Sequence, residues 1–256
     1  MFFYQENLKI TDDILDFGEF VWPLFVANIF IWILLFAGTS FGASTLGKVA
    51  YFTSLFPYVM LTVMIIFTSL LPGASKGIEF YLFKVKWEKL WEISVWRDAV
   101  SQVFYSTNCG FGASIQLASY NSYRHNILRD ATLIPILDGL TSIFAGFSVF
   151  TVLGYMATQR GVEVEKVVAD GPGLIFITYA EAFSQIEGGN VWAAFFFFMV
   201  IILGLSSQFP VTEMCCSCIS DSWPWFNKSR AHNLAMRAGV CIFGMALATI
   251  FFFGVF

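Results

Sequence analysis

Six stretches of the chain are apolar over roughly the 20 residues that a helix needs to cross the hydrocarbon of a bilayer. They cover approximately 21–38, 49–71, 99–120, 131–157, 191–219 and 235–256, and polar connections separate them. The pattern predicts an all-α, polytopic membrane protein with about six transmembrane helices, in a single transmembrane domain over residues 21–256.

The composition supports this fold class. Of the 256 residues, 57% are apolar and only 12% are charged, whereas soluble proteins average about 25% charged residues. We therefore expect a lipid bilayer, and no nucleic acid, among the partners of the chain.

The distribution of Lys and Arg predicts the orientation. The connections 38–48, 121–130 and 220–234 hold five in 36 residues, and the segments 1–20, 72–98 and 158–190 hold eight in 80. Cytoplasmic loops carry an excess of Lys and Arg. The first group is therefore predicted to be cytoplasmic, 72–98 and 158–190 to be external loops, and 1–20 to be the remnant of one. The start, MFFYQENLKITDD, lacks the pattern of a signal peptide.

Both predicted external loops have helical patterns. In KWEKLWEISVWRDA, Trp87 and Trp91 are four residues apart on one helical face, which suits a short helix at the membrane surface. Segment 158–190 has two helical patches around the Gly-Pro-Gly turn at 171–173. It predicts a helical hairpin that dips into an outer vestibule, with a loosely attached surface loop as the alternative.

The third apolar stretch contains STNCGFG at 106–112, a run of polar residues and glycines. Non-helical backbone at membrane depth survives only inside protein or beside a wet cavity, because unpaired backbone groups are costly in lipid. The run therefore predicts a discontinuous helix at an interior site, where unwound carbonyls bind a small cation and a new helix N-terminus faces an anion. A continuous helix with two packing glycines is the alternative.

Several runs then resemble a known family. GKVAYFTSLFPYVMLTVMI, LPGASKGIEFYL, VWRDAVSQVFYSTNCGFGASIQLASYN, RDATLIPILDGLTSIFAGFSVFTVLGYMA, DGPGLIFITYAEA and FFFFMVIILGLSSQF follow one another with the spacing of the neurotransmitter:sodium symporter family. The resemblance implies that the six stretches are the fourth to ninth helices of a twelve-helix transporter. The chain would hold a partial leucine-transporter-type inverted-repeat fold and would be incomplete, without helices one to three and ten to twelve.

The resemblance also implies two sodium sites. The sodium next to the substrate would be bound by Ser106 in the break and by Asp138, where the family has Asn. The second would be bound by the carbonyl of Leu203 and the hydroxyls of Ser206 and Ser207. A packing role, with the hydroxyls bonded back to the preceding turn, is the alternative for this Ser pair.

The family's chloride ligands match Gln102, Ser106, Asp138 and Ser142, and its Tyr of helix two has no counterpart here. A carboxylate at Asp138 would repel chloride and supply the negative charge itself. We therefore expect weak or absent chloride dependence. The alternatives are that Asp138 is protonated or that the function has decayed.

By the same resemblance, the substrate would rest against Tyr105, Ser106, Gly110 and Phe111. Asn108 stands where glycine is common in the family, which would narrow the substrate pocket or change its polarity.

Three acidic or aromatic positions complete the set. Tyr120 and Asp221 match two residues of the family's cytoplasmic gate, although the Arg that pairs with this acid has no counterpart. Glu213 lies within the fifth apolar stretch and needs a partner, because a carboxylate is expensive in a membrane helix. We expect it to have a structural hydrogen-bond role. The run CCSC at 215–218 has no His nearby and favours helix packing over a metal site or acylation.

Together these features predict sodium-coupled symport of a small amino acid, amine or related neurotransmitter across the plasma membrane. Sodium ions are the expected co-substrate, chloride stays open, and homo-oligomers are compatible with the sequence. No enzyme constellation surrounds His125 or His232, and no filter motif indicates an ion channel. The alternative is a non-transporting membrane protein: a partial gene product, a regulatory isoform or a decayed copy.

Overall fold

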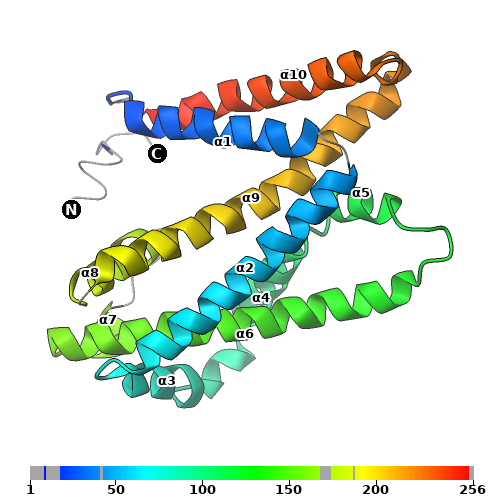
Figure 1. Cartoon of the computed structure of the whole chain (residues 1–256). Coiled ribbons are helices and arrows are strands. Elements are labelled where there is room, and N and C mark those ends of the chain that lie inside the picture. Colours follow the sequence, from blue (N-terminus) through cyan, green and yellow to red (C-terminus); the bar gives the residue numbers. More distant parts are fainter. Residues whose placement is uncertain (1–8, 10–17, 41–42, 168–173, 187, 254–256) are drawn as a thin grey trace. The chain divides into compact units, whose positions relative to one another are not determined.

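The chain folds into helices joined by turns. The computed structural model describes residues 9, 18–40, 43–167, 174–186 and 188–253 (Figure 1). It divides into two compact units, one formed by 1–54 with 202–256 and the other by 55–201. Helices α2 (Ala43–Ser69) and α9 (Gly189–Ser222) each contribute residues to both units.

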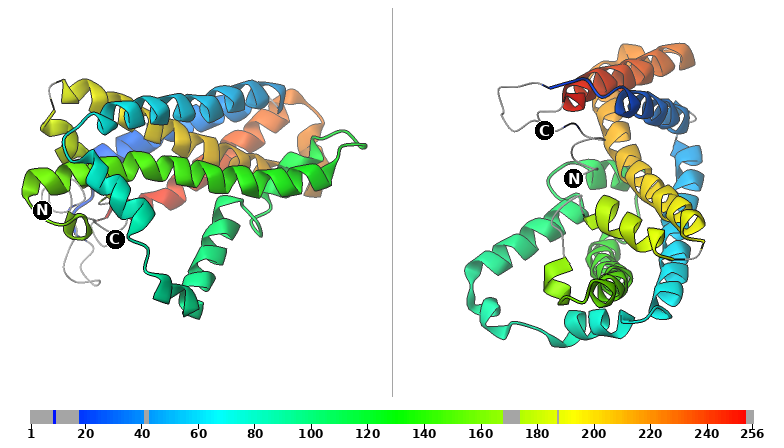
Figure 2. Two further views of the ribbon diagram at one scale, coloured as in Figure 1. Left: turned by 90° about the horizontal axis from the view of Figure 1, so that it is seen from below. Right: turned by 90° about the vertical axis from the view of Figure 1, so that its left-hand side faces the viewer.

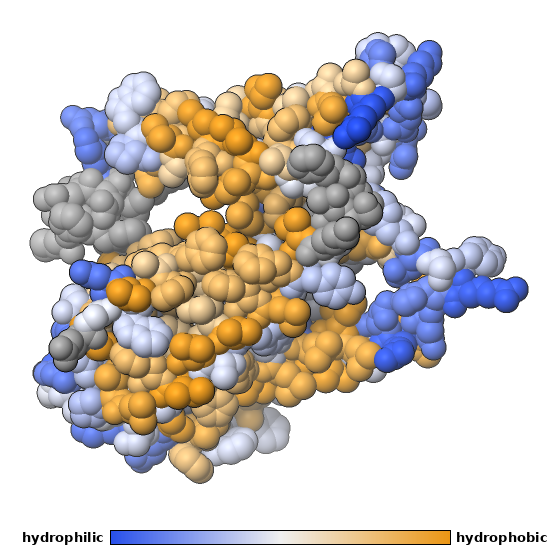
Figure 3. Space-filling view, in the orientation of Figure 1, coloured by the Kyte–Doolittle hydropathy of each residue, from blue (hydrophilic) through white to orange (hydrophobic). Residues whose placement is uncertain are grey.

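Five helical segments are long and apolar enough to cross a membrane. They are α1 (Trp22–Ser40), Val49–Ser69 of α2, α6 (Ile127–Arg160), α9, and Arg230–Phe252, which contains α10 (Arg230–Ala248) and the short η5 (Thr249–Phe252). Apolar side chains cover these helices along much of their length, and hydrophilic residues gather at the α5–α6 and α9–α10 connections (Figure 3). The predicted all-α, polytopic membrane fold is confirmed.

The remaining predicted span is divided. Helix α4 (Ile93–Ser106) and helix α5 (Ala113–Ser119) are separated by non-helical residues 107–112. Neither part reaches the length of a spanning helix, so the structure has five continuous candidates among its described residues and one discontinuous helix, as predicted.

The predicted external loops contain short helices. Residues Trp87–Trp91 form η2, a 3₁₀ helix whose Trp91 side chain is 93% exposed, and α3 (Ala74–Phe83) precedes it. The second loop contains α7 (Val164–Val167), the π-helix η3 (Leu174–Thr178) and α8 (Tyr179–Ser184). The Gly-Pro-Gly turn at 171–173 and most of the predicted remnant at 1–20 lie outside the described residues.

In the unit 55–201, α3 packs against α6 at a pair of glycines. A Cβ atom on Gly77 would lie 1.7 Å from the Phe150 carbonyl oxygen, and one on Gly154 would lie 2.5 Å from the Gly77 nitrogen. Small residues let two backbones approach this closely. Beside the crossing, the Tyr81 and Phe150 rings stack with centroids 4.5 Å apart. The two helices therefore form a tightly fitted pair (Figure 2).

Replacing Gly77 by Ala is expected to lower the free energy of unfolding by about 1–3 kcal/mol, because the added methyl overlaps backbone that cannot rotate away. Thermal unfolding of the purified protein measures the effect. Gly139→Ala is the matched control: it adds a methyl to α6 at a site with no other atom within 4 Å. Equal melting temperatures for the two variants would contradict the close crossing.

The core of this unit lies under the second predicted external loop. Tyr179 and Phe183 of α8 pack against Phe196 of α9, with the Tyr179 and Phe196 ring centroids 4.2 Å apart. All three side chains are buried. The expected alternative of a loosely attached loop does not describe α8, because its aromatic residues belong to the hydrophobic core.

In the other unit, α1 and α10 lie side by side and antiparallel (Figure 1). An isolated β-bridge joins Phe20, before α1, to Phe253, after η5. A small core gathers around Leu35, Leu205 and Phe209.

A buried ion pair crosses this unit. The Arg237 guanidinium of α10 donates to both carboxylate oxygens of Glu213 on α9, at 2.5 and 2.9 Å, and to the Thr39 carbonyl oxygen of α1 at 3.1 Å. The side chains are 11% and 3% exposed. This bidentate geometry gives Glu213 the partner that the sequence required, and the structure identifies it as Arg237.

Candidate functional site

The end of α4 explains why the helix stops in the middle of an apolar stretch. The Cys109 N–H donates to the Phe104 carbonyl oxygen at 2.9 Å, and the Asn108 N–H donates to the Tyr105 carbonyl oxygen at 3.1 Å. The backbone of Asn108 is in the left-handed region, with φ +54°. This is the Schellman arrangement, which satisfies two carbonyls that a helix end leaves open.

Asn108 is suited to this position because Asn follows Gly in its tolerance of left-handed backbone. We expect Asn108→Gly to be neutral or slightly stabilising. Asn108→Val is expected to destabilise the break by about 1–2 kcal/mol, because a β-branched side chain is strained there. Hydrogen exchange of the Cys109 amide reports this directly, and faster exchange in the Val variant alone is the expected result. Similar exchange in both variants would contradict a left-handed cap.

The far side of the break is equally defined. Gly112 precedes α5 with φ +87°, and Gly110 has φ +89°. The Ser114 hydroxyl of α5 donates to the Thr107 carbonyl oxygen across the break at 2.9 Å. Sequence reasoning missed Ser114, although a hydroxyl at the start of a helix beside an unwound segment is a usable signal. The alternative of a continuous helix with packing glycines is wrong.

Two residues of one predicted sodium site, Ser106 and Asp138, lie next to each other at the break. The Ser106 hydroxyl, in the last turn of α4, donates to the Asp138 carboxylate of α6 at 2.6 Å and also lies 3.2 Å from the Val103 carbonyl oxygen. The two residues are 32 positions apart in the chain. The fold therefore places a hydroxyl and a carboxylate together at the edge of the break.

The predicted chloride ligands flank this pair in register. Gln102 lies one turn before Ser106 on α4, and Ser142 lies one turn after Asp138 on α6. Both are exposed. Within the part of the chain that the structure describes, neither side chain forms a hydrogen bond, so only Ser106 and Asp138 of the four are hydrogen-bonded to each other.

The predicted substrate residues Tyr105, Ser106, Gly110 and Phe111 lie within the break and in the last turn of α4. The Tyr105 and Phe111 rings meet edge to face with centroids 6.2 Å apart. Their side chains are 68% and 57% exposed, and a Cβ atom on Gly110 would meet nothing within 4 Å. The structure gives these residues an aromatic corner around exposed backbone, and their role in substrate binding stays a prediction.

The second predicted sodium set lies in the other unit, on α9. The Ser206 and Ser207 hydroxyls both donate to the Leu203 carbonyl oxygen, at 2.7 and 3.3 Å. Three oxygens thus converge within one turn. The hydroxyls are bonded back to the preceding turn, which is the arrangement expected for the alternative, a packing role. Rotation of the hydroxyls would turn their lone pairs toward a cation.

The two predicted gate residues lie at helix ends. Tyr120 caps α5 and accepts a hydrogen bond from the Gln116 side-chain amide at 3.2 Å, whereas Asp221 lies in the last turn of α9. They belong to different compact units. Their pairing in a gate stays a prediction.

A family comparison matches nearly the whole chain. The profile of the Sodium:neurotransmitter symporter family matches residues 1–255.

Curated relatives agree with it. The sodium- and chloride-dependent glycine transporter 1 of Xenopus laevis is 44% identical over 214 residues, which are 84% of this chain and 34% of the relative. The sodium- and chloride-dependent GABA transporter 2 of Rattus norvegicus is 39% identical over 248 residues, 96% of this chain and 41% of the relative. The human sodium- and chloride-dependent neutral and basic amino acid transporter B(0+) is 39% identical over 234 residues, which are 91% of this chain and 36% of the relative. The chain spans about a third to two-fifths of the length of these relatives.

Proposed function

Because the chain belongs to the sodium:neurotransmitter symporter family, we propose that it acts in sodium-coupled symport and that the break between α4 and α5 carries part of the ion and substrate site. The family consists of transporters and not of enzymes. The substrate would be a small amino acid or amine taken up across the plasma membrane. Relatives named for glycine and GABA favour a small amino acid.

The observation that carries the proposal is the contact between Ser106 and Asp138. Sodium is a hard cation that takes oxygen ligands, and these side chains offer a hydroxyl and a carboxylate at a helix break. When sodium binds, the Ser106 hydroxyl would turn its lone pairs to the ion and its proton away from the carboxylate. The hydrogen bond seen here would then be exchanged for two bonds to the ion.

Coupling follows from the position of this pair. Ser106 is in the turn that ends α4, so a sodium ion held by Ser106 and Asp138 would fix the end of α4 against α6. The substrate would then bind the exposed backbone and the Tyr105–Phe111 corner next to the ion. Each ligand would favour the conformation in which the other binds, and the coupling is reciprocal.

Uptake of labelled glycine and GABA tests the proposal, in cells that express the protein. We expect uptake that requires external sodium. Ser106→Ala is expected to raise the sodium concentration for half-maximal uptake about tenfold, because one hydrogen-bonding ligand is worth about 1.5 kcal/mol. Ser101→Ala is the matched control, because Ser101 lies on the same helix and its side chain forms no hydrogen bond within the described residues.

Two outcomes would contradict the proposal. A protein that reaches the surface and takes up neither compound in a sodium-dependent manner would favour the non-transporting alternative. Uptake with an unchanged sodium requirement in Ser106→Ala would remove this residue from the ion site.

A further inference from the structure

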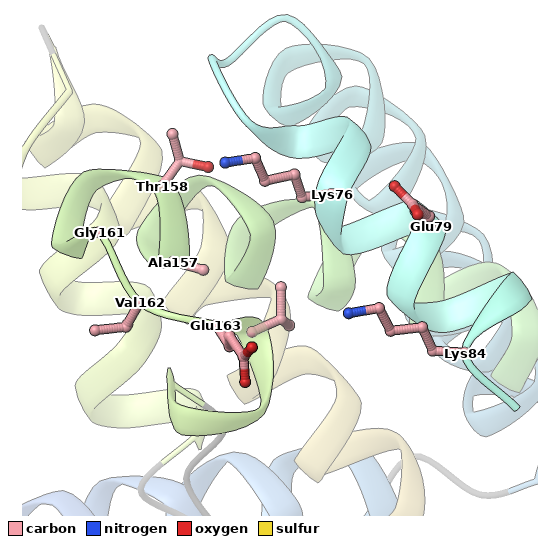
Figure 4. Close-up of a pocket in the computed structure, with 9 residues that line it drawn as sticks. Lys76, Glu79, Lys84, Ala157, Thr158, Gly161, Val162 and Glu163 are labelled. Carbon is pink, nitrogen blue, oxygen red and sulfur yellow. The ribbon is translucent and has the colours of Figure 1, made fainter. Parts of the chain in front are cut away.

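A cavity lies where α3 meets the end of α6, away from the helix break. Its volume is about 510 Å³, and its lining comes from α3 and the residue after it, from the end of α6, and from the segment that leads into α7 (Figure 4). The lining residues are Lys76, Glu79, Lys84, Ala157, Thr158, Gly161, Val162, Glu163 and Val164. This volume falls within the range of small-molecule sites.

The charges in the cavity are balanced and separated. Lys76 of α3 and Lys84, the residue that follows α3, extend toward the cavity, and Lys76 points toward the Thr158 hydroxyl, as Figure 4 shows. Glu163 enters from the opposite wall, and Glu79 shares the α3 wall with the two lysines. Over the described part of the chain, no ion pair within 4.0 Å involves Lys76, Glu79 or Glu163. The α3 side of the cavity therefore presents two ammonium groups and the Glu79 carboxylate to a ligand, and the opposite side presents the Glu163 carboxylate.

The walls are held in place by contacts outside the cavity. Gly77, next to Lys76 in sequence, sits against the α6 backbone at the glycine crossing, so α3 cannot slide along α6 without a clash. The Lys86 ammonium lies 3.2 Å from the Glu165 carboxylate, and this ion pair joins the segment after α3 to α7. Buried Ala157 and Val164 form an apolar part of the lining. An apolar wall with a few convergent charged groups around it is typical of a ligand site.

We propose that this cavity binds a small zwitterion, with its anionic oxygens on Lys76 and Lys84 and its ammonium group on Glu163. An anion alone would face the Glu163 carboxylate, and a cation alone would face two lysines. A molecule with both charges satisfies both walls, because charge-assisted hydrogen bonds are the strong ones. Two sources supply this chemistry: a soluble amino acid and the headgroup of a zwitterionic phospholipid.

Lysine footprinting tests the proposal without relying on transport. The protein in nanodiscs is acetylated briefly with an N-hydroxysuccinimide ester, and mass spectrometry gives the acetylation rate of each lysine. The zwitterionic probe is N,N-dimethylglycine, which has no primary amine to consume the reagent. Its isosteres are isovalerate, which lacks the ammonium group, and N,N-dimethylethylamine, which lacks the carboxylate. Lys89, exposed in the same external segment and paired with Glu92, is the internal control.

In sodium-free phosphatidylglycerol nanodiscs, we expect dimethylglycine to protect Lys76 and Lys84 and to leave Lys89 unchanged. Isovalerate is expected to need an about tenfold higher concentration for the same protection, because it forms no charge-assisted bond with Glu163. Glu163→Gln is expected to remove this difference, and Glu92→Gln is expected to preserve it.

The lipid arm separates the two sources. Protection of Lys76 and Lys84 by phosphatidylcholine nanodiscs without any soluble ligand would identify the headgroup as the occupant, and its absence would identify a soluble zwitterion. Three results would overturn the proposal. The first is that neither dimethylglycine nor phosphatidylcholine protects Lys76 and Lys84, and the second is that isovalerate protects them as well as dimethylglycine does. The third is that, without any soluble ligand, phosphatidylglycerol protects the two lysines as strongly as phosphatidylcholine does. Since sodium is absent and Asp138→Ala is expected to leave the footprint unchanged, failure here is distinct from failure of the transport proposal.

Discussion

Asp138→Asn is expected to make sodium-coupled uptake depend on chloride. Two unit charges 4 Å apart interact with about 4 kcal/mol at the effective dielectric constant near a protein surface. The Asp138 carboxylate, hydrogen-bonded to Ser106, would therefore supply a large part of the field around a sodium ion in the proposed site. Once Asn removes this charge, a chloride ion becomes the available source of compensation. Replacement of external chloride by gluconate should then lower uptake by at least about tenfold in Asp138→Asn.

The unmodified protein is the reference for this experiment, and it is expected to lose little uptake without chloride. Asp130→Asn is the matched control, because Asp130 lies in the first turn of α6 and pairs with His125, away from Ser106. Strong chloride dependence with Asp138 intact would show that the carboxylate does not replace chloride. Chloride-independent uptake by Asp138→Asn would show that no compensating anion is needed.

Arg237→Met is expected to cost the fold about 3–5 kcal/mol, which is typical when one partner of a buried ion pair is removed. The Glu213 carboxylate, 3% exposed, would stay buried without its bidentate partner, and the Thr39 carbonyl would lose a donor. Denaturant titration of the purified protein measures the loss. The double variant Glu213→Gln with Arg237→Met should recover most of it, because no charge is then left unpaired.

Arg97→Met is the matched control for this prediction. Arg97 pairs with Asp98 at 3.0 Å, but both side chains are about 70% exposed, and such pairs contribute about 0–1 kcal/mol. If Arg237→Met destabilised the protein no more than Arg97→Met, the pair would not stabilise the fold. If the double variant were as unstable as Arg237→Met, the cost would come from lost packing of the Arg side chain and not from the bare charge.

The break between α4 and α5 was predictable from local chemistry. A left-handed cap needs Gly or Asn, and Asn108, Gly110 and Gly112 supply three such residues within an apolar stretch. Their backbone preferences hold wherever the segment lies, so sequence alone marks the point where the helix ends. The hydroxyl of Ser114 that bridges the break was not predicted, because it depends on the angle at which α5 restarts.

Partners far apart in the chain depended on the fold. The sequence indicated that Glu213 needs a partner, but it did not identify Arg237. The hydropathy pattern shows that Arg237 is a charged residue in an apolar helix, and it does not show toward which neighbouring helix the side chain points. The resemblance placed Ser106 and Asp138 in one site, whereas the hydrogen bond between them depends on where the end of α4 lies relative to α6.

The sequence by itself determined that this chain is an all-α membrane protein, that one helix is discontinuous and where it breaks, because hydrophobic length and left-handed residues are local properties. Only the tertiary structure decided that α3 locks onto α6 through Gly77 and Gly154, that Arg237 neutralises Glu213, and that lysines and a glutamate face each other across one cavity. Each of these depends on which helix faces meet. The hydrophobic pattern fixes how much of a membrane helix is apolar, and in lipid it leaves the choice of neighbour to close packing and to the pairing of buried polar groups.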